Sequence, residues 1–317
     1  MVQDFLGAAS EFTNGLIAKF IQVDKYAFCI PYKSGRMISA DTPFDQTTVA
    51  NHYDDLDLFY REIWGEHVHH GFWTTGTESP EIAVQRLVDS VAEKAQIKPG
   101  DRVLDIGCGY GAPARQLAQQ YGADVTAITL SAVQYAHSKG LGREENPRYL
   151  LADWLRTDFP AQLFQAAIAI ESTEHMPDRV EFFRKAFDVL RTGGRLVVCA
   201  WLARERPSSL ETRWLLRPIC VEGRIPHLMS LAELERAAET AGFVIVESHD
   251  CTRAVCATWG IILRRLVEHL LKDSRYRAFL LDRRQSNRVF GLTVLRIWLA
   301  YKMGAMRYGI LTVTRPV

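Results

Sequence analysis

The feature that most constrains the fold is a short apolar strand that ends in a run of glycines at the start of a helix. The segment at residues 103–111 reads Val-Leu-Asp-Ile-Gly-Cys-Gly-Tyr-Gly. Glycines let the backbone turn tightly and approach a ligand closely at the carboxyl end of a strand. The segment therefore predicts a ligand-binding turn between a buried strand and a helix.

Strands and helices are expected to alternate regularly after this turn. Five apolar strands separated by helical patterns are followed by two further strands near the C-terminus. The seven strands are expected at residues 102–106, 124–130, 148–152, 164–170, 195–201, 243–248 and 310–314. Such alternation predicts an α/β fold with a doubly wound, mostly parallel seven-stranded sheet.

The carboxylate of Asp105, directly before the glycines, limits what the turn can hold. A dinucleotide site needs amide donors and room for a pyrophosphate at the helix N-terminus. A carboxylate at this place would repel a pyrophosphate, but it suits a ligand that carries an ammonium group. This chemistry points away from NAD and toward S-adenosylmethionine.

The motif Leu-Asp-Ile-Gly-Cys-Gly resembles that of the class I S-adenosylmethionine-dependent methyltransferases, and the resemblance covers residues 97–201. It implies the Rossmann-like methyltransferase fold. It also implies a methionine-end site in the glycine turn, a carboxylate near the adenine amino group and an aromatic ring over the adenine. The positions that match are Asp105, Gly107, Cys108, Gly109 and Gly111 in the turn, then Asp153 and Trp154. From the residue alone, Asp153 could instead cap the helix that follows it.

The second strand departs from the usual family pattern. Most members place an acidic residue at its end to bind the ribose, whereas Thr129 stands there in this chain. The run Thr-Leu-Ser-x-x-Gln, from Thr129 through Leu130 to Gln134, resembles the tocopherol C-methyltransferase branch and its cyclopropane fatty acid synthase relatives. The resemblance implies that these three residues face the cofactor.

Two further stretches are similar to the same branch and imply catalytic residues. The run Glu-Ser-Thr-Glu-His-Met-Pro-Asp at residues 171–178 follows the fourth strand, next to the expected position of the reacting methyl group. Glu171, Glu174 and His175 are candidates for a proton acceptor. We favour Glu171 as a base or cation stabiliser and His175 as a substrate-positioning group.

The second stretch, at residues 59–73, resembles the aromatic lid of these enzymes. His70 is expected near the substrate or the cofactor carboxylate, and Tyr53 is expected to cover the cofactor. His67, His69 and His70 do not have the spacing of a helical ligand pair, so no metal site is expected.

Three parts of the chain are expected: a helical and aromatic lid segment at 1–78, the cofactor-binding core at 79–202, and a helical substrate cap with the last strands at 203–317. The lid begins with a helical pattern over residues 5–20.

Of the 317 residues 48% are hydrophobic and 24% charged, with a formal net charge of +1, which excludes an intrinsically disordered chain. No apolar run has the length of a membrane span. The six cysteines form no CxxC pair, and the chain starts without a secretory signal pattern, so a cytoplasmic location is expected.

The charge is distributed unevenly. From residue 251 onward the chain has thirteen Lys and Arg residues against three acidic ones, on an otherwise acidic chain. A basic segment of this kind indicates an anionic partner, which leaves three alternatives: a substrate diphosphate with Mg²⁺, a membrane surface in peripheral contact, or the acidic body itself.

These features predict a methyltransferase that acts on a carbon of a small lipophilic substrate, such as an isoprenoid, an isoprenyl diphosphate or a prenylated aromatic compound. An O- or N-methyltransferase of a natural product is the alternative. No Asn-Pro-Pro-Tyr-like tetrapeptide follows the fourth strand, so a nucleic-acid substrate is not expected. The intact glycine turn and Glu171 loop are atypical of a non-catalytic protein. A homo-oligomer is left open.

Overall fold

The computed structural model describes residues 38–40, 46–141, 145–282, 284 and 287–317. The chain divides into two units, Met1–Arg36 and Met37–Val317, and the second contains every described residue. The helical pattern noted at residues 5–20 lies outside the described residues.

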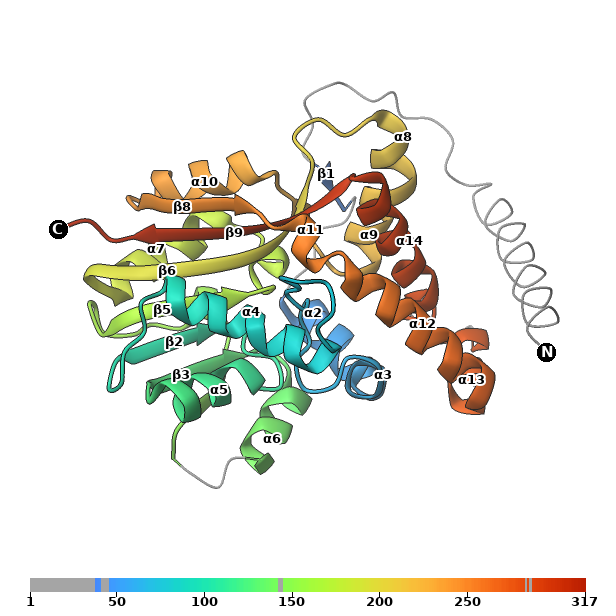
Figure 1. Ribbon diagram of the computed structural model, residues 1–317, viewed down its shortest axis with the longest axis horizontal. Coiled ribbons are helices and arrows are strands. Elements are labelled where there is room, and N and C mark those ends of the chain that lie inside the picture. The colour runs from blue at the N-terminus through green and yellow to red at the C-terminus, as the bar shows by residue number, and fades with distance from the viewer. Residues whose placement is uncertain (1–37, 41–45, 142–144, 283, 285–286) are drawn as a thin grey trace. The chain divides into compact units, whose positions relative to one another are not determined.

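The second unit is built on a seven-stranded sheet with the order β4-β3-β2-β5-β6-β9-β8 (Figure 1). Neighbouring strands from β4 to β6 run parallel, and β9 is antiparallel to both β6 and β8. The strands are β2 (Arg102–Ile106), β3 (Asp124–Thr129), β4 (Arg148–Leu151), β5 (Phe164–Ile170), β6 (Leu190–Ala203), β8 (Val244–Asp250) and β9 (Met306–Thr314). The predicted doubly wound, mostly parallel sheet of seven strands is confirmed.

Helices cover both faces of this sheet because successive strand residues point to opposite sides. Val103 packs on the face that α4 and α5 cover, and Leu104 packs on the face that α7 and α10 cover. The helices are α4 (Pro80–Lys94), α5 (Ala112–Tyr121), α6 (Ala132–Leu141), α7 (Arg179–Val189) and α10 (Leu231–Thr240). Two short 3₁₀ helices follow strands β4 and β5, namely η1 (Trp154–Arg156) and η2 (Thr173–His175).

The remaining helices form the predicted cap, which lies to the right of the sheet in Figure 1. One part comes from the lid segment, as α2 (Gln46–Asp55) and α3 (Asp57–Ile63). The rest comes from the C-terminal third: α8 (Ser209–Glu211), the π-helical turn η3 (Thr212–Leu216), α9 (Arg217–Glu222), α11 (Thr252–Val255), α12 (Ala257–Lys272), α13 (Ser274–Leu281) and α14 (Phe290–Met303). A two-stranded antiparallel sheet, β1 (Ile38–Ser39) with β7 (His227–Leu228), joins these two parts of the cap. The division at residues 78 and 202 stays a prediction.

Many apolar residues of the cap are buried within it, among them Leu216, Trp259 and Val294. Among the described helices, none combines the length and the apolar character that crossing a membrane requires.

Candidate functional site

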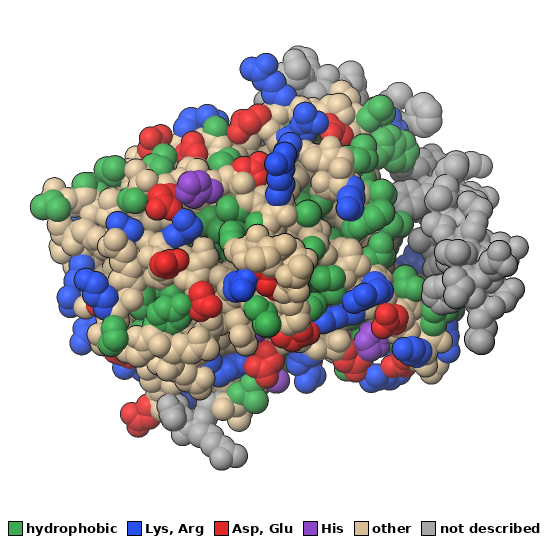
Figure 2. Space-filling view, in the orientation of Figure 1, with side chains coloured by type: hydrophobic (Ala, Val, Ile, Leu, Met, Phe, Trp, Pro, Cys, Tyr) green, Lys and Arg blue, Asp and Glu red, His purple; other side chains and the backbone are tan. Residues whose placement is uncertain are grey.

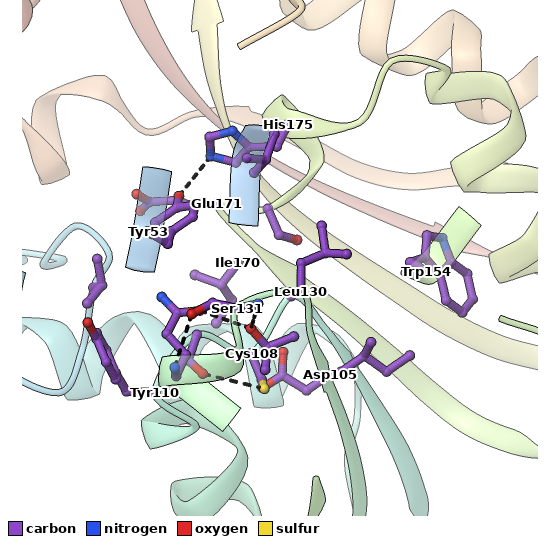
Figure 3. A pocket seen from close by; sticks show the side chains of 18 of the residues that line it. Tyr53, Asp105, Cys108, Tyr110, Leu130, Ser131, Trp154, Ile170, Glu171 and His175 are labelled. Atoms are coloured by element: carbon purple, nitrogen blue, oxygen red, sulfur yellow. Dashed lines mark hydrogen bonds between the residues drawn. The ribbon is translucent and has the colours of Figure 1, made fainter. Parts of the chain in front are cut away.

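A crevice of about 880 Å³ opens at the carboxyl ends of β2, β3 and β5, beside helix α2. Figure 3 shows its labelled side chains: Asp105 and Cys108 lie at one end, Tyr53, Glu171 and His175 at the other, and Leu130 and Ile170 between them. The predicted residues that line it are Tyr53, Asp105, Gly107, Cys108, Gly109, Thr129, Leu130, Gln134, Asp153, Trp154, Glu171 and His175. The fold therefore brings nearly all the expected cofactor residues together.

Asp105 has the clearest signature of a ligand contact in this crevice. It is 1% exposed, and its Oδ2 atom has no hydrogen-bond partner. Burial raises the pKa of Asp105 to about 7. A buried carboxylate oxygen without a partner costs free energy, and a ligand ammonium group would remove that cost. The crevice thus fits the methionine end of S-adenosylmethionine.

The three glycines of the turn are needed for different reasons. A Cβ atom on Gly107 would lie 2.2 Å from Cβ of Ser172, whereas a Cβ atom on Gly109 would meet nothing within 4 Å. Gly109 therefore leaves open space in the crevice. Gly111 is not among the residues that line the crevice: it precedes α5, where a Cβ would lie 2.5 Å from the ring of Tyr149, and its cofactor role stays a prediction.

The end of β3 is held by side-chain hydrogen bonds. The Thr129 hydroxyl donates to Oε1 of Gln134 at 2.9 Å, and Ser131 donates to Asp54 of α2. Helix α2 is thereby attached to the loop after β3, next to Thr129, where a cofactor contact was expected. Sequence reasoning missed Asp54 and Ser131, since their pairing spans 77 residues.

Asp153 and Trp154 line the crevice but also have structural roles. Asp153 accepts a hydrogen bond from the backbone N–H of Leu155 and so caps η1, as its alternative interpretation predicted. Trp154 lies apart from the other labelled side chains in Figure 3, and its ring packs against Phe159 and Phe182. An adenine-covering role for Trp154 stays a prediction.

A second cavity, of about 840 Å³, adjoins the crevice. Four residues line both: Tyr53, Val68, Glu171 and His175. The other lining residues are His52, Tyr60, Trp64, His70, Glu174, Trp201, Ile219, Glu222, Gly223, Ile225, Trp259, Asn287, Val289, Phe290, Thr293, Val294 and Ile297. We call the crevice the cofactor chamber and the second cavity the aromatic chamber. The two chambers meet at Glu171.

Glu171 is fixed by four hydrogen bonds at this junction. Its Oε1 atom accepts from the backbone N–H of His70 at 2.7 Å, from Nδ1 of His70 at 3.0 Å and from the hydroxyl of Tyr308 at 2.8 Å. Its Oε2 atom accepts from Nε1 of Trp201 at 2.7 Å. Burial by itself would raise the pKa of Glu171, but the His70 ring and its hydrogen bonds outweigh burial and lower the pKa to about 2. Glu171 is therefore ionised at neutral pH and is a weaker base than an ordinary carboxylate.

His70 lines the second cavity and positions Glu171. Nε1 of Trp259 donates to Nε2 of His70 at 2.7 Å, so the ring proton must reside on Nδ1, which faces Glu171. This arrangement makes His70 a donor to the carboxylate and excludes it as a base.

Glu174 has the opposite character to Glu171. It is 4% exposed, lines the second cavity, and accepts a hydrogen bond from the backbone N–H of Trp201. Burial, with the neighbouring charge of Glu171, raises the pKa of Glu174 to about 7. When the pKa values of two nearby carboxyl groups are far apart, one group usually stays ionised and the other exchanges a proton. With its raised pKa, Glu174 is the stronger base of the two carboxylates, and both line the second cavity.

His175 is a neutral ring that holds Tyr53. Its Nδ1 atom donates to the carbonyl of Arg224 at 3.2 Å, and its Nε2 atom accepts from the Tyr53 hydroxyl at 2.8 Å (Figure 3). Burial lowers the pKa of His175 to about 4. His175 therefore positions Tyr53 at the boundary between the two cavities, and its predicted substrate-positioning role stays a prediction.

The three lid histidines do not converge on a metal position. His67 and His69 are hydrogen-bonded through Nδ1 and Nε2 at 3.0 Å, and Nδ1 of His69 donates to the carbonyl of His70. Burial lowers the pKa of His67 to about 3. These rings therefore fix the backbone that carries His70.

The basic C-terminal segment pairs extensively with the rest of the protein. Arg265 pairs with Glu81, Arg275 with Glu62, and Arg296 with Glu222. Arg315 donates to three backbone carbonyls near the end of α7. Among the described residues that line the two cavities, none is Lys or Arg. Of the three expected partners for this segment, these contacts match the acidic body.

Of the aromatic residues around Glu171, Trp259 falls in the predicted substrate cap, whereas Trp201 and Tyr308 were not predicted as functional residues. Trp201, Trp259 and Tyr308 come from β6, α12 and β9. Each falls in an apolar pattern that is typical of a core, so only their convergence in space identifies them.

The family described as mycolic acid cyclopropane synthetase matches residues 41–299. The 27-O-demethylrifamycin SV methyltransferase of Amycolatopsis mediterranei (strain S699) is 32% identical over 215 residues, 67% of this chain and 79% of that protein. The probable tocopherol O-methyltransferase, chloroplastic, of Oryza sativa subsp. japonica is 27% identical over 288 residues, 84% of this chain and 78% of that protein. The solved structure of the cyclopropane synthase MmaA2 from Mycobacterium tuberculosis is similar with a TM-score of 0.75 and 23% identity, covering 86% of this chain and 99% of that one.

Proposed function

Because the chain belongs to the mycolic acid cyclopropane synthetase family and is an S-adenosylmethionine-dependent methyltransferase, we propose that it methylates a carbon of an uncharged isoprenoid or prenylated aromatic compound. The observation that carries the proposal is the Glu171 anion among aromatic rings, where the cofactor chamber meets the aromatic chamber. When bound, S-adenosylmethionine supplies an electrophilic methyl group.

The surroundings of Glu171 suit a substrate that becomes cationic. A carbon nucleophile such as an alkene or an electron-rich ring is positively charged once it has gained a methyl group. The Glu171 carboxylate and the faces of Trp201 and Trp259 would stabilise that charge. The hydrogen bonds to Glu171 fix it before the reaction, so little reorganisation is needed.

Glu174 then takes the proton that the substrate must lose. Its carboxyl lines the same chamber as Trp201, and its pKa of about 7 allows it to be ionised and still accept a proton near neutral pH. His175 and His70 keep Tyr53 and Glu171 in place during this step.

The lining of the aromatic chamber supports an uncharged substrate. It carries three carboxyl groups, Glu171, Glu174 and Glu222, and no Lys or Arg among the described residues. Glu222 is paired with Arg296, but a diphosphate would still be repelled by the Glu171 anion unless Mg²⁺ neutralised it. We therefore favour a neutral isoprenoid over an isoprenyl diphosphate with Mg²⁺ as the substrate.

Transfer of labelled methyl groups tests the substrate class. The protein is incubated with S-adenosylmethionine labelled in its methyl group and with matched isoprenoid compounds that end in a hydroxyl or in a diphosphate, with and without Mg²⁺. We expect kcat/KM to be at least about tenfold higher for the neutral compounds. A preference for the diphosphate that depends on Mg²⁺ would contradict the neutral-substrate proposal.

O-methylation is the second candidate, and one observation favours it. The Tyr53–His175 pair lies at the boundary of the two cavities, where a substrate hydroxyl could replace Tyr53 as the donor to His175. His175 is a weaker base than Glu174, because burial lowers its pKa to about 4. Because His175 is the weaker base, we rank O-methylation below C-methylation.

The proposal also includes a cytoplasmic location and leaves homo-oligomer formation open. The location is supported by the described cysteines at 108, 199, 220, 251 and 256, which are all free thiols.

A further inference from the structure

The aromatic chamber contains an ion pair that the proposed mechanism does not use. Glu222, the last residue of α9, lines the chamber, and its carboxylate pairs with the guanidinium of Arg296 on α14. On the face drawn in Figure 2, acidic and basic side chains are interspersed, and pairs at such a surface form at little cost. The side chains of Glu222 and Arg296 are only 13% and 14% exposed. Removing such a pair from water costs free energy that apolar residues of similar size would not.

This pair presents its carboxylate to the chamber. Among the described residues that line the chamber, Glu222 is present and Arg296 is not. The Oε1 atom of Glu222 pairs with Arg296, and its Oε2 atom accepts a hydrogen bond from the hydroxyl of Thr293 at 2.8 Å. An ionised carboxylate can accept about four hydrogen bonds. Glu222 is therefore fixed in place and can still accept a hydrogen bond from a ligand in the chamber.

Two other polar side chains of the chamber, His52 and Asn287, are engaged with protein partners. Nδ1 of His52 donates to Oδ1 of Asn287 at 3.1 Å, and its Nε2 atom accepts from the hydroxyl of Tyr60 at 3.3 Å. The amide nitrogen of Asn287 donates to Asp55 at 3.0 Å. Both ring nitrogens of His52 are thus used within the protein, which leaves Glu222 as the better acceptor for a ligand.

Glu222 lies far from the end of the chamber where Glu171 is held. Thr293, which contacts Glu222, precedes Tyr301 by eight residues on α14. The ring centroid of Tyr301 lies 5.4 Å from that of His70, which donates to Glu171. Eight residues of helix correspond to about 12 Å along its axis. A group bound by Glu222 is therefore remote from the position of methyl transfer.

We propose that Glu222 accepts a hydrogen bond from a substrate hydroxyl and so determines specificity for an isoprenoid alcohol. This role rests on the proposed function and deepens it, because it identifies the polar group of the otherwise lipophilic substrate. Hydrogen bonds to an ionised acceptor are stronger than those between neutral groups. The hydrocarbon chain extends from Glu222 along the side of α14 that carries Val294 and Ile297, toward Glu171.

The charge of the pair favours a hydroxyl over other polar groups. Arg296 compensates the charge of Glu222, so the pair has no net charge with which to attract an ammonium group. A substrate carboxylate or phosphate has no proton to donate and would be repelled by the carboxylate. A hydroxyl donates a hydrogen bond without bringing a charge into the chamber. Binding at Glu222 also keeps this hydroxyl away from the methyl donor, which agrees with methylation at carbon.

Equilibrium binding of two matched probes tests this specificity. The probes are farnesol and its methyl ether, which has the same hydrocarbon chain but no hydrogen-bond donor. Each is titrated into the full chain saturated with S-adenosylhomocysteine, and the fluorescence of the chamber tryptophans Trp64, Trp201 and Trp259 reports binding. We expect the wild type to bind farnesol at least about tenfold more tightly than the ether.

Two double variants change the acceptor without leaving a buried charge unpaired. Glu222→Leu/Arg296→Met removes the acceptor, so the preference for farnesol should fall to about one while the ether binds as in the wild type. Glu222→Gln/Arg296→Met keeps an uncharged acceptor and should retain a preference of about threefold. A purely structural role of the pair would change the Kd of both probes equally.

The matched control is Glu211→Gln/Arg204→Met. Glu211 lies on the same stretch of cap helix, is 8% exposed and pairs with Arg204, but neither residue lines the aromatic chamber. Gln at position 211 can keep the capping interaction with Ser208. This control should keep the wild-type preference, and every variant should bind S-adenosylhomocysteine normally, which shows that it is folded.

Three outcomes would overturn the role of Glu222. The wild type could bind neither probe, it could bind both equally, or Glu222→Leu/Arg296→Met could keep the wild-type preference for farnesol. Methyl transfer is not part of this measurement. A protein with the expected preference that transfers no methyl group to any neutral isoprenoid would contradict the proposed function and not the hydroxyl site.

Discussion

Asp105 makes cofactor affinity depend on pH, because its carboxyl must be ionised to bind an ammonium group. Burial raises the pKa of Asp105 to about 7, so protonation of the free protein competes with the ligand below that pH. We expect affinity for S-adenosylhomocysteine to fall about tenfold between about pH 8 and about pH 6. Asp105→Asn should lose about tenfold or more at the higher pH and remove most of the pH dependence. Calorimetric titration measures both effects.

Asp124→Asn is the matched control for this titration. Asp124 lies at the exposed start of β3 and pairs with Arg148, away from the crevice. It should keep both the affinity and the pH dependence. An Asp105→Asn protein that binds like the wild type would exclude Asp105 from the site.

The division of roles between the two carboxyl groups gives a second prediction. If Glu174 accepts the proton, kcat should rise with pH through about 7, since a base must be ionised to act. Glu174→Gln should lower kcat by about a hundredfold or more and abolish this rise, with unchanged affinity for S-adenosylhomocysteine. Initial rates across the pH range provide the measurement.

Glu171→Gln and Glu239→Gln distinguish a base from other roles. Glu171→Gln should lower kcat and keep a rise with pH, but the rise should shift to lower pH because the charge of Glu171 helps to raise the pKa of Glu174. Glu239→Gln, at an exposed position of α10, should change neither kcat nor its rise with pH. If Glu171→Gln removes the rise and Glu174→Gln keeps it, the assignment of the base must be reversed.

The sequence predicts the role of a residue well where that role depends on a short motif. It predicts the role poorly where the contacting residues are distant in the sequence. Asp105 and the glycine turn lie within seven residues, so their chemistry could be inferred directly. The state of Glu171 depends on His70, Trp201 and Tyr308, which are 101, 30 and 137 residues away. Its low pKa and the high pKa of Glu174 follow from those contacts, and no local pattern encodes them.

At the scale of elements, the approach of β2 to the η2 loop depends on Gly107. A Cβ atom there would lie 2.2 Å from Cβ of Ser172, and the backbone φ of 86° is unfavourable for other residues. We expect Gly107→Ala to reduce the free energy of unfolding by about 2 kcal/mol or more. Urea denaturation followed by circular dichroism measures this loss.

Gly109→Ala provides the comparison. The added Cβ meets nothing within 4 Å, so about 1 kcal/mol of backbone strain is the main expected cost to stability. Since Gly109 lines the crevice, its substitution should weaken cofactor binding more than it destabilises the fold. Equal losses of stability in the two variants would contradict this account of the turn.

The expected elements differ from the observed ones mainly where a side chain ends a helix. The cap was expected to be helical after residue 203, and within it Asp273 separates α12 from α13: it adopts an extended conformation and accepts a hydrogen bond from the backbone N–H of Arg275. The last strand was expected at residues 310–314, and β9 begins earlier, at Met306, because it pairs with β6 along that length. Pairing of this kind is tertiary and has no signal in the strand itself.

At the scale of the whole molecule, the uneven charge along the sequence is compensated in space. The basic C-terminal segment returns over an acidic body, and its arginines pair with Glu62, Glu81 and Glu222. The sequence could predict an anionic partner for this segment but not which one. Likewise it could predict a sheet and a cap, whereas the chamber between them arises from the packing of α9, α12 and α14 against α2 and α3.

The central claim is that this chamber directs a methyl group to a carbon of a neutral lipophilic substrate. The most direct test uses S-adenosylmethionine with a ¹³C-labelled methyl group, a neutral prenylated substrate and NMR of the purified product. The account predicts that the labelled carbon is bonded to a substrate carbon. A labelled methyl bonded to oxygen, or no transfer to any neutral isoprenoid, would contradict it.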